Sequence, residues 1–174
     1  MLEAIEKIID IIGYFGPQIL ILLTIFLLFN KYTLLQIYLI GFVINSFLNF
    51  VLKGIIKQPR PSEDKHVFNV WLNNGMKGDR LWFDRFGMPS GHAQSVFYST
   101  FFIIFALQNT NINILYLIIS LNTLYQRVKY KNHTVLQIIV GAIVGTIIGS
   151  LLYYYSQKIL QGKLKEKEDD NAPI

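Results

Sequence analysis

Residues 88–95 read MPSGHAQS and lead into an apolar run that continues to Leu107. Pro89 is typical of the turn before a helix, and Ser90 is typical of the N-cap position. Gly91 has no side chain, so its backbone N–H can lie close to a ligand, and helix starts attract anions. His92, beside such an anion pocket, is placed to protonate a leaving group. Taken alone, these residues fit a capped helix with an incidental histidine equally well.

The composition of the 174-residue chain is that of a membrane protein. Hydrophobic residues make up 52% of it, the mean hydropathy is +0.39, and the apolar residues come in long runs. The chain has no cysteine, which excludes disulfides and thiolate metal sites. Its net charge of +5 is modest and no nucleic-acid-binding motif is present, so we expect no nucleic-acid partner.

The apolar runs predict an all-α, polytopic membrane helix bundle with about five transmembrane helices. The predicted spans cover residues 11–29, 33–52, 93–107, 114–125 and 135–155, after a short amphipathic lead-in over 1–10. Mixed aromatic and charged residues over 62–87 predict a polar interfacial loop between the second and third spans. We expect one transmembrane domain over 1–161 and a charged, disordered tail over 162–174.

Small and polar residues inside the predicted spans indicate where helices touch. Gly141, Gly145 and Gly149 recur every four residues in the fifth span. This small-xxx-small pattern lets helices approach closely in lipid. Asn45 and Asn49, inside the second span, need partners on a neighbouring helix at the same depth.

Alternation of five spans brings distant polar residues to one membrane surface. The second span ends, the third begins, the fourth ends and the fifth begins on the same side. The residues at these ends are Lys53, Arg60, Ser90, Gly91, His92, Arg127 and His133. Basic side chains around a helix N-terminus are typical of a phosphate pocket. We therefore expect these residues, from three separate parts of the chain, to form one phosphate-binding site.

Three ordered segments resemble the signature of the type 2 phosphatidic-acid phosphatase superfamily, membrane lipid phosphatases that also include the vanadium haloperoxidases. The first motif, a lysine, six residues and Arg-Pro, is matched by Lys53 and residues 60–61. The second, Pro-Ser-Gly-His, is matched by residues 89–92. Arg127 and His133 match the third motif with the family's spacing. The resemblance covers residues 53–137, and three motifs in order are far more specific than one.

The third motif departs from the family pattern at two positions. Gln126 replaces a serine, and Gln137 replaces the aspartate that orients the nucleophilic histidine in the family. A glutamine carbonyl can still accept the ring N–H, but it cannot supply negative charge. Residues 133–137 read His-Thr-Val-Leu-Gln, which is similar to this motif in the dolichyl-diphosphatase branch. An active enzyme of that branch is the favoured interpretation, and a weakened or inactive relative is the alternative.

The resemblance implies that three cations, Lys53, Arg60 and Arg127, hold the phosphoryl oxygens of a substrate. The Ser90 hydroxyl and the Gly91 N–H would add further donors. Donors placed in this way also stabilise the charge that develops during phosphoryl transfer.

The resemblance also implies the chemistry. His133 would attack phosphorus and form a phosphohistidine, while His92 would protonate the leaving oxygen and then activate water. Gln137 would orient His133. No acidic pair suited to magnesium lies near the motifs, because Asp169 and Asp170 are in the tail, so we expect neither a metal nor a cofactor.

The sequence therefore predicts a metal-independent, integral-membrane hydrolase whose partner is a lipid of the surrounding bilayer. Polyprenyl or dolichyl diphosphate is the favoured substrate, and Lys57, Lys129 and Lys131 would help to hold its extra charge. A phosphatidic-acid-type phosphatase and a catalytically inactive lipid-headgroup binder are the alternatives. A small transporter with an anion gate would leave the paired histidines unexplained, and haloperoxidase chemistry fits poorly because its known members are soluble.

Two arguments about membrane orientation disagree. Lysine and arginine residues are more numerous on the side of the motifs, and the positive-inside rule would put that side in the cytoplasm. The resemblance implies a lumenal or extracytoplasmic site, in the endoplasmic reticulum or another internal membrane of a eukaryotic or viral system, and otherwise in a plasma membrane. Several of these charges are needed to bind phosphate, so their number says less about orientation than the rule assumes. We therefore favour the lumenal or extracytoplasmic side.

Overall fold

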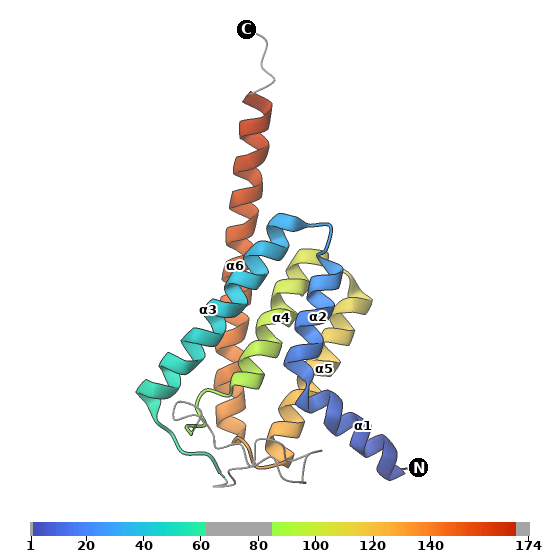
Figure 1. The fold of residues 1–174 in the computed structure, drawn as a ribbon, viewed down its shortest axis with the longest axis vertical. Coiled ribbons are helices and arrows are strands. Elements are labelled where there is room, and N and C mark those ends of the chain that lie inside the picture. The colour runs from blue at the N-terminus through green and yellow to red at the C-terminus, as the bar shows by residue number, and fades with distance from the viewer. Residues whose placement is uncertain (1, 62–84, 170–174) are drawn as a thin grey trace.

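The computed structural model describes residues 2–61 and 85–169, and these form a bundle of α-helices (Figure 1). The helices are α1 (Leu2–Tyr14), α2 (Gly16–Leu27), α3 (Tyr32–Ile56), α4 (Gly91–Leu107), α5 (Thr110–Lys129) and α6 (Val135–Asp169). No strand occurs within the two described ranges, and the all-α prediction is confirmed. Most of the predicted interfacial loop falls in 62–84, outside the described residues.

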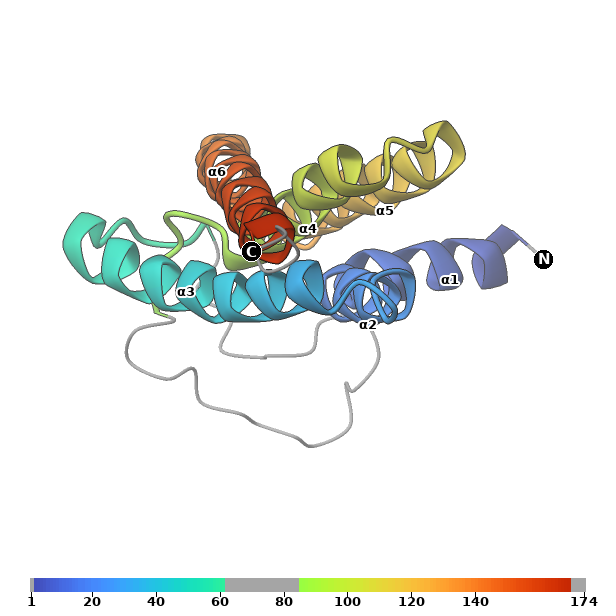
Figure 2. The ribbon, with the colours of Figure 1, turned by 90° about the horizontal axis from the view of Figure 1, so that it is seen from above.

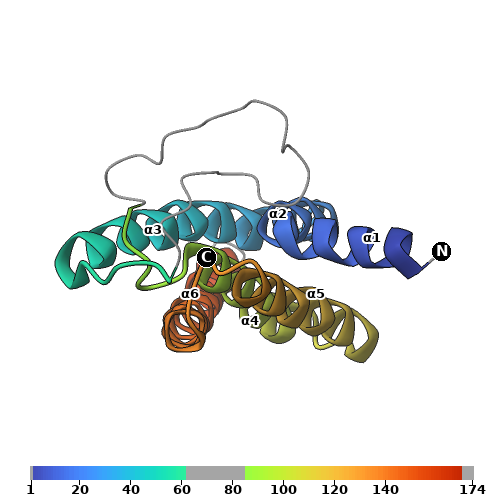
Figure 3. The ribbon, with the colours of Figure 1, turned by 90° about the horizontal axis from the view of Figure 1, so that it is seen from below.

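The central helix of the bundle is α4, which packs against α2, α3, α5 and α6. Seen from above and from below, α1, α2 and α3 form one row, and α4, α5 and α6 lie beside it (Figure 2, Figure 3). Tyr98 of α4 stacks on Tyr38 of α3 with ring centroids 5.4 Å apart, and Phe102 meets Tyr38 edge-on at 5.3 Å. All three rings are fully buried because α4 has neighbours on every side.

Polar side chains inside α3 find partners on α4, as the sequence predicts. Gln94 Nε2 donates to Asn45 Oδ1 at 3.0 Å, and Asn49 Nδ2 donates to Gln94 Oε1 at 2.8 Å. All three side chains are buried, where an unpaired amide would cost about 1–3 kcal/mol. This amide chain therefore fixes the lengthwise position of α3 on α4.

The glycines of α6 lie directly against the backbone of α4, which confirms the predicted close packing. A Cβ added at Gly141 would lie 2.5 Å from the Ser90 carbonyl oxygen. One added at Gly145 would overlap the carbonyl oxygen of Gln94. Only glycine allows this approach, because the obstructing atoms belong to the main chain and cannot rotate away.

The first predicted span is wrong as a single helix over residues 11–29. The chain forms α1 and α2, which meet at a bend of 68° between Tyr14 and Gly16. Pro17 has no N–H to donate to the preceding turn, so the helical hydrogen bonds are interrupted there. The amphipathic lead-in is therefore part of α1, and the break between the two helices lies beside the site described below.

The length and composition of the described helices support a membrane protein, but they do not confirm five spans. Two helices are long and apolar enough to cross a bilayer: α3, and α6 over Val135–Lys163. The bent pair Glu3–Tyr14 and Gly16–Leu27 would add a third if it forms one span, and α4 is a shorter apolar helix. Large side chains such as Val43 and Phe47, 67% and 68% exposed, give α3 an outer apolar face suited to lipid.

The charged tail was predicted to be disordered over residues 162–174, but α6 continues through Gly162 to Asp169. Lysine, leucine and glutamate dominate residues 163–168, and all three favour helix. The only proline of the tail is Pro173, so nothing in the sequence stops the helix earlier.

Replacement of Gly145 by alanine tests the contact between α4 and α6. Gly145→Ala forces the helices apart, so we expect the midpoint of thermal unfolding in detergent to fall by roughly 2–10 °C. Gly162→Ala is the matched control in the same helix, because its Cβ would meet none of the described residues within 4 Å. An unchanged midpoint for Gly145→Ala would contradict the close packing.

Candidate active site

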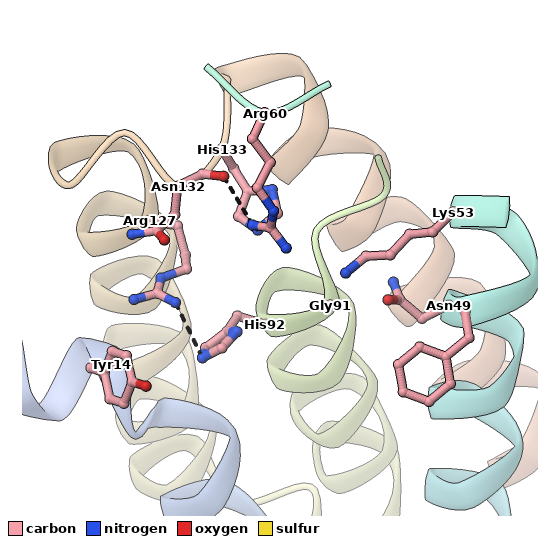
Figure 4. Close-up of a pocket in the computed structure, with 10 residues that line it drawn as sticks. Tyr14, Asn49, Lys53, Arg60, Gly91, His92, Arg127, Asn132 and His133 are labelled. Carbon is pink, nitrogen blue, oxygen red and sulfur yellow. Dashed lines mark hydrogen bonds between the residues drawn. The ribbon is translucent and has the colours of Figure 1, made fainter. Parts of the chain in front are cut away.

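The end of α3, the start of α4, the end of α5 and the start of α6 lie at one end of the bundle (Figure 1). They surround a cavity of about 170 Å³ (Figure 4). Among the predicted site residues, those that line it are Lys53, Arg60, Gly91, His92, Arg127 and His133. The structure thus brings together groups that lie far apart in the sequence, while Ser90 and Gln137 lie behind the cavity wall.

Hydrogen bonds on both ring nitrogens fix the orientation of His133. Arg60 Nη1 lies 2.9 Å from His133 Nε2, and a guanidinium can only donate, so Nε2 is the acceptor. The ring proton is therefore on Nδ1, which donates to the Gly87 carbonyl at 2.9 Å and to Gln137 Oε1 at 3.2 Å. His133 is only 3% exposed, and its Nε2 lone pair is held on the side of the cavity.

Gln137 connects His133 to the segment that carries Arg60. While its Oε1 accepts from His133, its Nε2 donates to the Pro59 carbonyl at 2.9 Å and to Gln58 Oε1 at 3.1 Å. The geometry agrees with an orienting role for Gln137. An aspartate could not make the two donor contacts, so the departure from the family pattern has a local structural reason.

The second histidine and arginine of the cavity form a similar pair. Arg127 Nη1 lies 3.4 Å from His92 Nε2, so Nε2 of His92 is again the acceptor. Arg127 Nε donates to Gln126 Oε1 at 2.7 Å. Gln126, the other departure from the family motif, therefore helps to orient the guanidinium of Arg127.

The start of α4 is built as the sequence predicts. Ser90 is the N-cap, and its Oγ accepts from the N–H of Ala93 at 3.4 Å while its own N–H donates to the Gln137 carbonyl at 3.1 Å. The serine is fully buried, so the phosphate-binding role of its hydroxyl stays a prediction. Gly91 lines the cavity, and a Cβ there would lie 3.1 Å from Asn49 Oδ1.

Four residues outside the predicted site also line the cavity: Tyr14, Asn49, Phe50 and Asn132. Asn49 lies one helical turn before Lys53, and this spacing is the one sequence signal that could have identified it. Asn132 accepts from Arg60 Nη1 through its carbonyl at 3.0 Å. Tyr14 lies at the bend between α1 and α2, outside every motif, and no sequence signal points to it.

The lysines proposed to hold the extra charge of a diphosphate do not line the cavity. Lys129 Nζ instead bonds to Asp10 Oδ2 at 2.8 Å and to Glu6 Oε1 at 2.7 Å, both on α1. Lys57 and Lys131 are exposed. The prediction was wrong for Lys129 because the lead-in folds as a helix against α5 and supplies carboxylates.

The electrostatic environment keeps the His133 imidazole neutral. Burial, followed by the positive charges of Arg60 and Lys53, holds the pKa of the His133 imidazole well below its usual range. The ring is therefore neutral at pH 7. Among the described residues that line the cavity none is a carboxylate, and no group of three or more His, Cys, Asp or Glu there could hold a metal ion.

Comparison with known proteins places the chain in a family. Residues 34–161 match the model of the PAP2 superfamily, which is well over half of the chain. The protein therefore belongs to the PAP2 superfamily, and the resemblance seen in the three motifs is confirmed.

The curated relatives described here are named either lipid phosphate phosphatase or dolichyldiphosphatase. The chain is 35% identical over 122 residues to lipid phosphate phosphatase epsilon 2, chloroplastic, of Arabidopsis thaliana, covering 66% of this chain and 37% of that protein. It is 28% identical over 162 residues to dolichyldiphosphatase 1 of Plecturocebus moloch, covering 83% and 63%. It is 29% identical over 125 residues to the dolichyldiphosphatase of Saccharomyces cerevisiae, covering 66% and 48%. The chain thus spans 37–63% of the length of these relatives, and no solved structure matches it significantly.

Proposed function

We propose that the protein is an integral-membrane phosphohydrolase that removes phosphate from a lipid phosphate or diphosphate through a phosphohistidine. The observation that carries this proposal is the position of the His133 Nε2 lone pair, at a cavity also lined by Lys53, Arg60 and Arg127. A neutral imidazole is a nucleophile, and the cations offset the negative charge that otherwise repels it from a phosphoryl group. The names of the relatives support phosphate release from a lipid.

In the first step, phosphoryl oxygens accept hydrogen bonds from the arginines, from Lys53 and from the Gly91 N–H. These oxygens replace the histidines as acceptors of the arginine hydrogen bonds, so Nε2 of His133 and Nε2 of His92 are both released. His92 Nε2 takes up the proton that the monoprotonated phosphate group of the substrate brings into the cavity. His133 Nε2 then forms a bond to phosphorus as the bond to the leaving oxygen breaks, and His92 passes its Nε2 proton to that oxygen. The Gly87 carbonyl and Gln137 Oε1 hold the Nδ1 proton throughout.

In the second step, a water molecule attacks the phosphohistidine. His92 Nε2 takes a proton from the water as the new P–O bond forms, and the P–N bond breaks with its electron pair returning to His133 Nε2. The products are inorganic phosphate and the shortened lipid. The proposal includes no metal ion, so we expect full activity in EDTA.

A polyprenyl or dolichyl diphosphate is the proposed substrate. Gln137 gives His133 no negative charge, so the imidazole is a weaker nucleophile than one paired with a carboxylate. A phosphoanhydride has a better leaving group than a phosphate ester, because a phosphate monoester leaves more readily than an alkoxide. Phosphatidic acid is the second candidate, supported by the relative named as a lipid phosphate phosphatase.

We also propose that the cavity opens on the lumenal or extracytoplasmic side of an internal or plasma membrane. The positive-inside rule counts cations near the membrane ends, but Lys53, Arg60 and Arg127 line the cavity and Lys129 is paired with carboxylates. These four charges serve local interactions, which weakens the argument for a cytoplasmic site.

Replacement of His133 and replacement of His92 should reduce activity in different ways. His133→Ala removes the nucleophile, so we expect neither phosphoenzyme nor turnover with a radiolabelled lipid diphosphate. His92→Ala should lower turnover by about 10²–10⁴-fold, and a nitrophenolate leaving group should recover part of the loss. His66→Ala is the control, since it replaces a histidine outside the three motifs. A labelled phosphoenzyme in His133→Ala would contradict the assignment.

Substrate preference can be measured by phosphate release from two lipids in the same detergent. We expect the wild-type protein to convert a polyprenyl diphosphate to the monophosphate faster than it dephosphorylates phosphatidic acid, at equal substrate concentration. Added inorganic phosphate gives a control for product inhibition. A clear preference for phosphatidic acid would contradict the diphosphatase proposal and leave the lipid phosphate phosphatase.

Membrane orientation can be tested cleanly because the chain has no cysteine. Arg85→Cys places a single thiol at an exposed position two residues before Gly87, whose carbonyl bonds His133 at the cavity. Lys31→Cys places one at an exposed position just before α3, and the start of α3 lies at the end of the bundle opposite the cavity (Figure 1). An impermeant thiol reagent applied to sealed vesicles of known orientation should label Arg85→Cys from the extracytoplasmic face and Lys31→Cys from the cytoplasmic face. The reverse pattern would overturn the proposed orientation.

A further inference from the structure

Tyr14 reaches the cavity from a part of the chain that lies outside the family match. The match to the PAP2 superfamily begins at residue 34, after both α1 and α2. Tyr14 nevertheless lines the cavity, as the last residue of α1 at the 68° bend (Figure 4). None of the roles assigned so far uses this segment.

Tyr14 contacts both members of the Arg127–His92 pair. The guanidinium carbon of Arg127 lies 4.9 Å from the centre of the Tyr14 ring, within the range of a cation–π interaction. The rings of Tyr14 and His92 have centroids 5.9 Å apart, and the His92 ring hydrogen-bonds the backbone of Tyr14. One residue therefore restrains the arginine through its ring and the histidine through its main chain.

The contact with Arg127 sets the tautomer of His92. Nε2 of His92 accepts from Arg127, so the proton of the neutral ring is on Nδ1. The last carbonyls of a helix have no partner in their own helix and carry partial negative charge, which favours a nearby cation. With Nδ1 protonated, the proton that His92 gains and loses is the one on Nε2. His133 has the same tautomer, with its Nδ1 proton donated to the Gly87 carbonyl.

Close packing and ion pairs hold the bend in place against α5. A Cβ added at Gly13 would lie 2.7 Å from Gln126 Cβ, and one added at Gly16 would overlap Thr123 Oγ1. Asp10 Oδ2 accepts from Lys129 Nζ at 2.8 Å. These contacts join α1 and the start of α2 to the end of α5 that carries Arg127, so they fix the position of the bend relative to the guanidinium.

We propose that Tyr14 is a positioning residue that aims His92 Nε2 and the Arg127 guanidinium at the leaving oxygen. The inference rests on the proposed phosphohydrolase function and extends its site to residues 2–27. Tyr14 does not itself take part in bond making. It acts through His92, the acid of the first step. Its removal should therefore slow the reaction most for a substrate whose leaving group needs a proton.

The test compares leaving groups in the first turnover. Tyr14→Ala keeps the main chain but removes the ring that packs against the Arg127 guanidinium and the His92 imidazole. With a lipid monophosphate, whose leaving group is an alkoxide, this variant should slow leaving-group release by about tenfold or more. The loss with p-nitrophenyl phosphate should be several-fold smaller, following the pattern of His92→Ala. Tyr14→Phe keeps the ring and the main chain and should resemble the wild type. The melting temperature of each variant in detergent reports whether it is folded.

Equal losses for both substrates, or wild-type rates in folded Tyr14→Ala, would overturn the positioning role. Both outcomes leave the phosphohydrolase proposal standing, because wild-type turnover is measured alongside. A wild-type protein that turns over no phosphate substrate contradicts the proposed function and removes this inference with it.

A second pair of variants tests the position of the bend without altering Tyr14. Gly16→Ala pushes the start of α2 away from Thr123, so it should give the same leaving-group-dependent loss. Thr123→Ala removes the overlapping oxygen and leaves Thr123 Cβ, at 3.2 Å, as the nearest remaining contact, so the double variant should recover much of the activity. A double variant no better than Gly16→Ala, or a Gly16→Ala loss independent of the leaving group, would count against the inference.

Discussion

The contact between the glycines of α6 and the main chain of α4 is the constraint on which the site depends. It sets the start of α4 directly beside the start of α6, where the Ser90 N–H donates to the Gln137 carbonyl at 3.1 Å. Gly91 and His92 at the start of α4 thereby line the same cavity as His133, just before α6, although more than one helix separates them in the chain. A side chain at Gly141 or Gly145 would move these two segments apart and change the distance between the histidines.

Within that frame, the two cavity histidines have similar surroundings. An arginine donates to Nε2 of each ring, and each ring also hydrogen-bonds a backbone group, that of Gly87 for His133 and that of Tyr14 for His92. These contacts orient the two imidazoles without a carboxylate, and no acidic residue belongs to the described lining of the cavity. Two such groups on opposite sides of one phosphoryl group would supply a nucleophile and an acid, which is the division of roles proposed for His133 and His92.

Features that depend on a local sequence pattern could be predicted from the sequence. Features that depend on packing between residues far apart in the chain could not. Motif spacing identified the cavity residues at the ends of α3 to α6, and the four-residue repeat of glycines identified the helix contact. The bend at Pro17 was missed because an apolar run with one proline near its start resembles a single span. Tyr14 could not be predicted, because its place in the cavity follows from that bend. Lys129 was misassigned because its carboxylate partners lie more than a hundred residues away in the chain.

The most direct test of the central claim is an experimental structure of the protein with bound vanadate, which imitates five-coordinate phosphorus. The account predicts a bond from vanadium to His133 Nε2, with the vanadate oxygens contacted by Lys53, Arg60 and Arg127 and one apical oxygen facing His92 Nε2. Vanadate bound outside the cavity, or bonded through a different side chain, would contradict it.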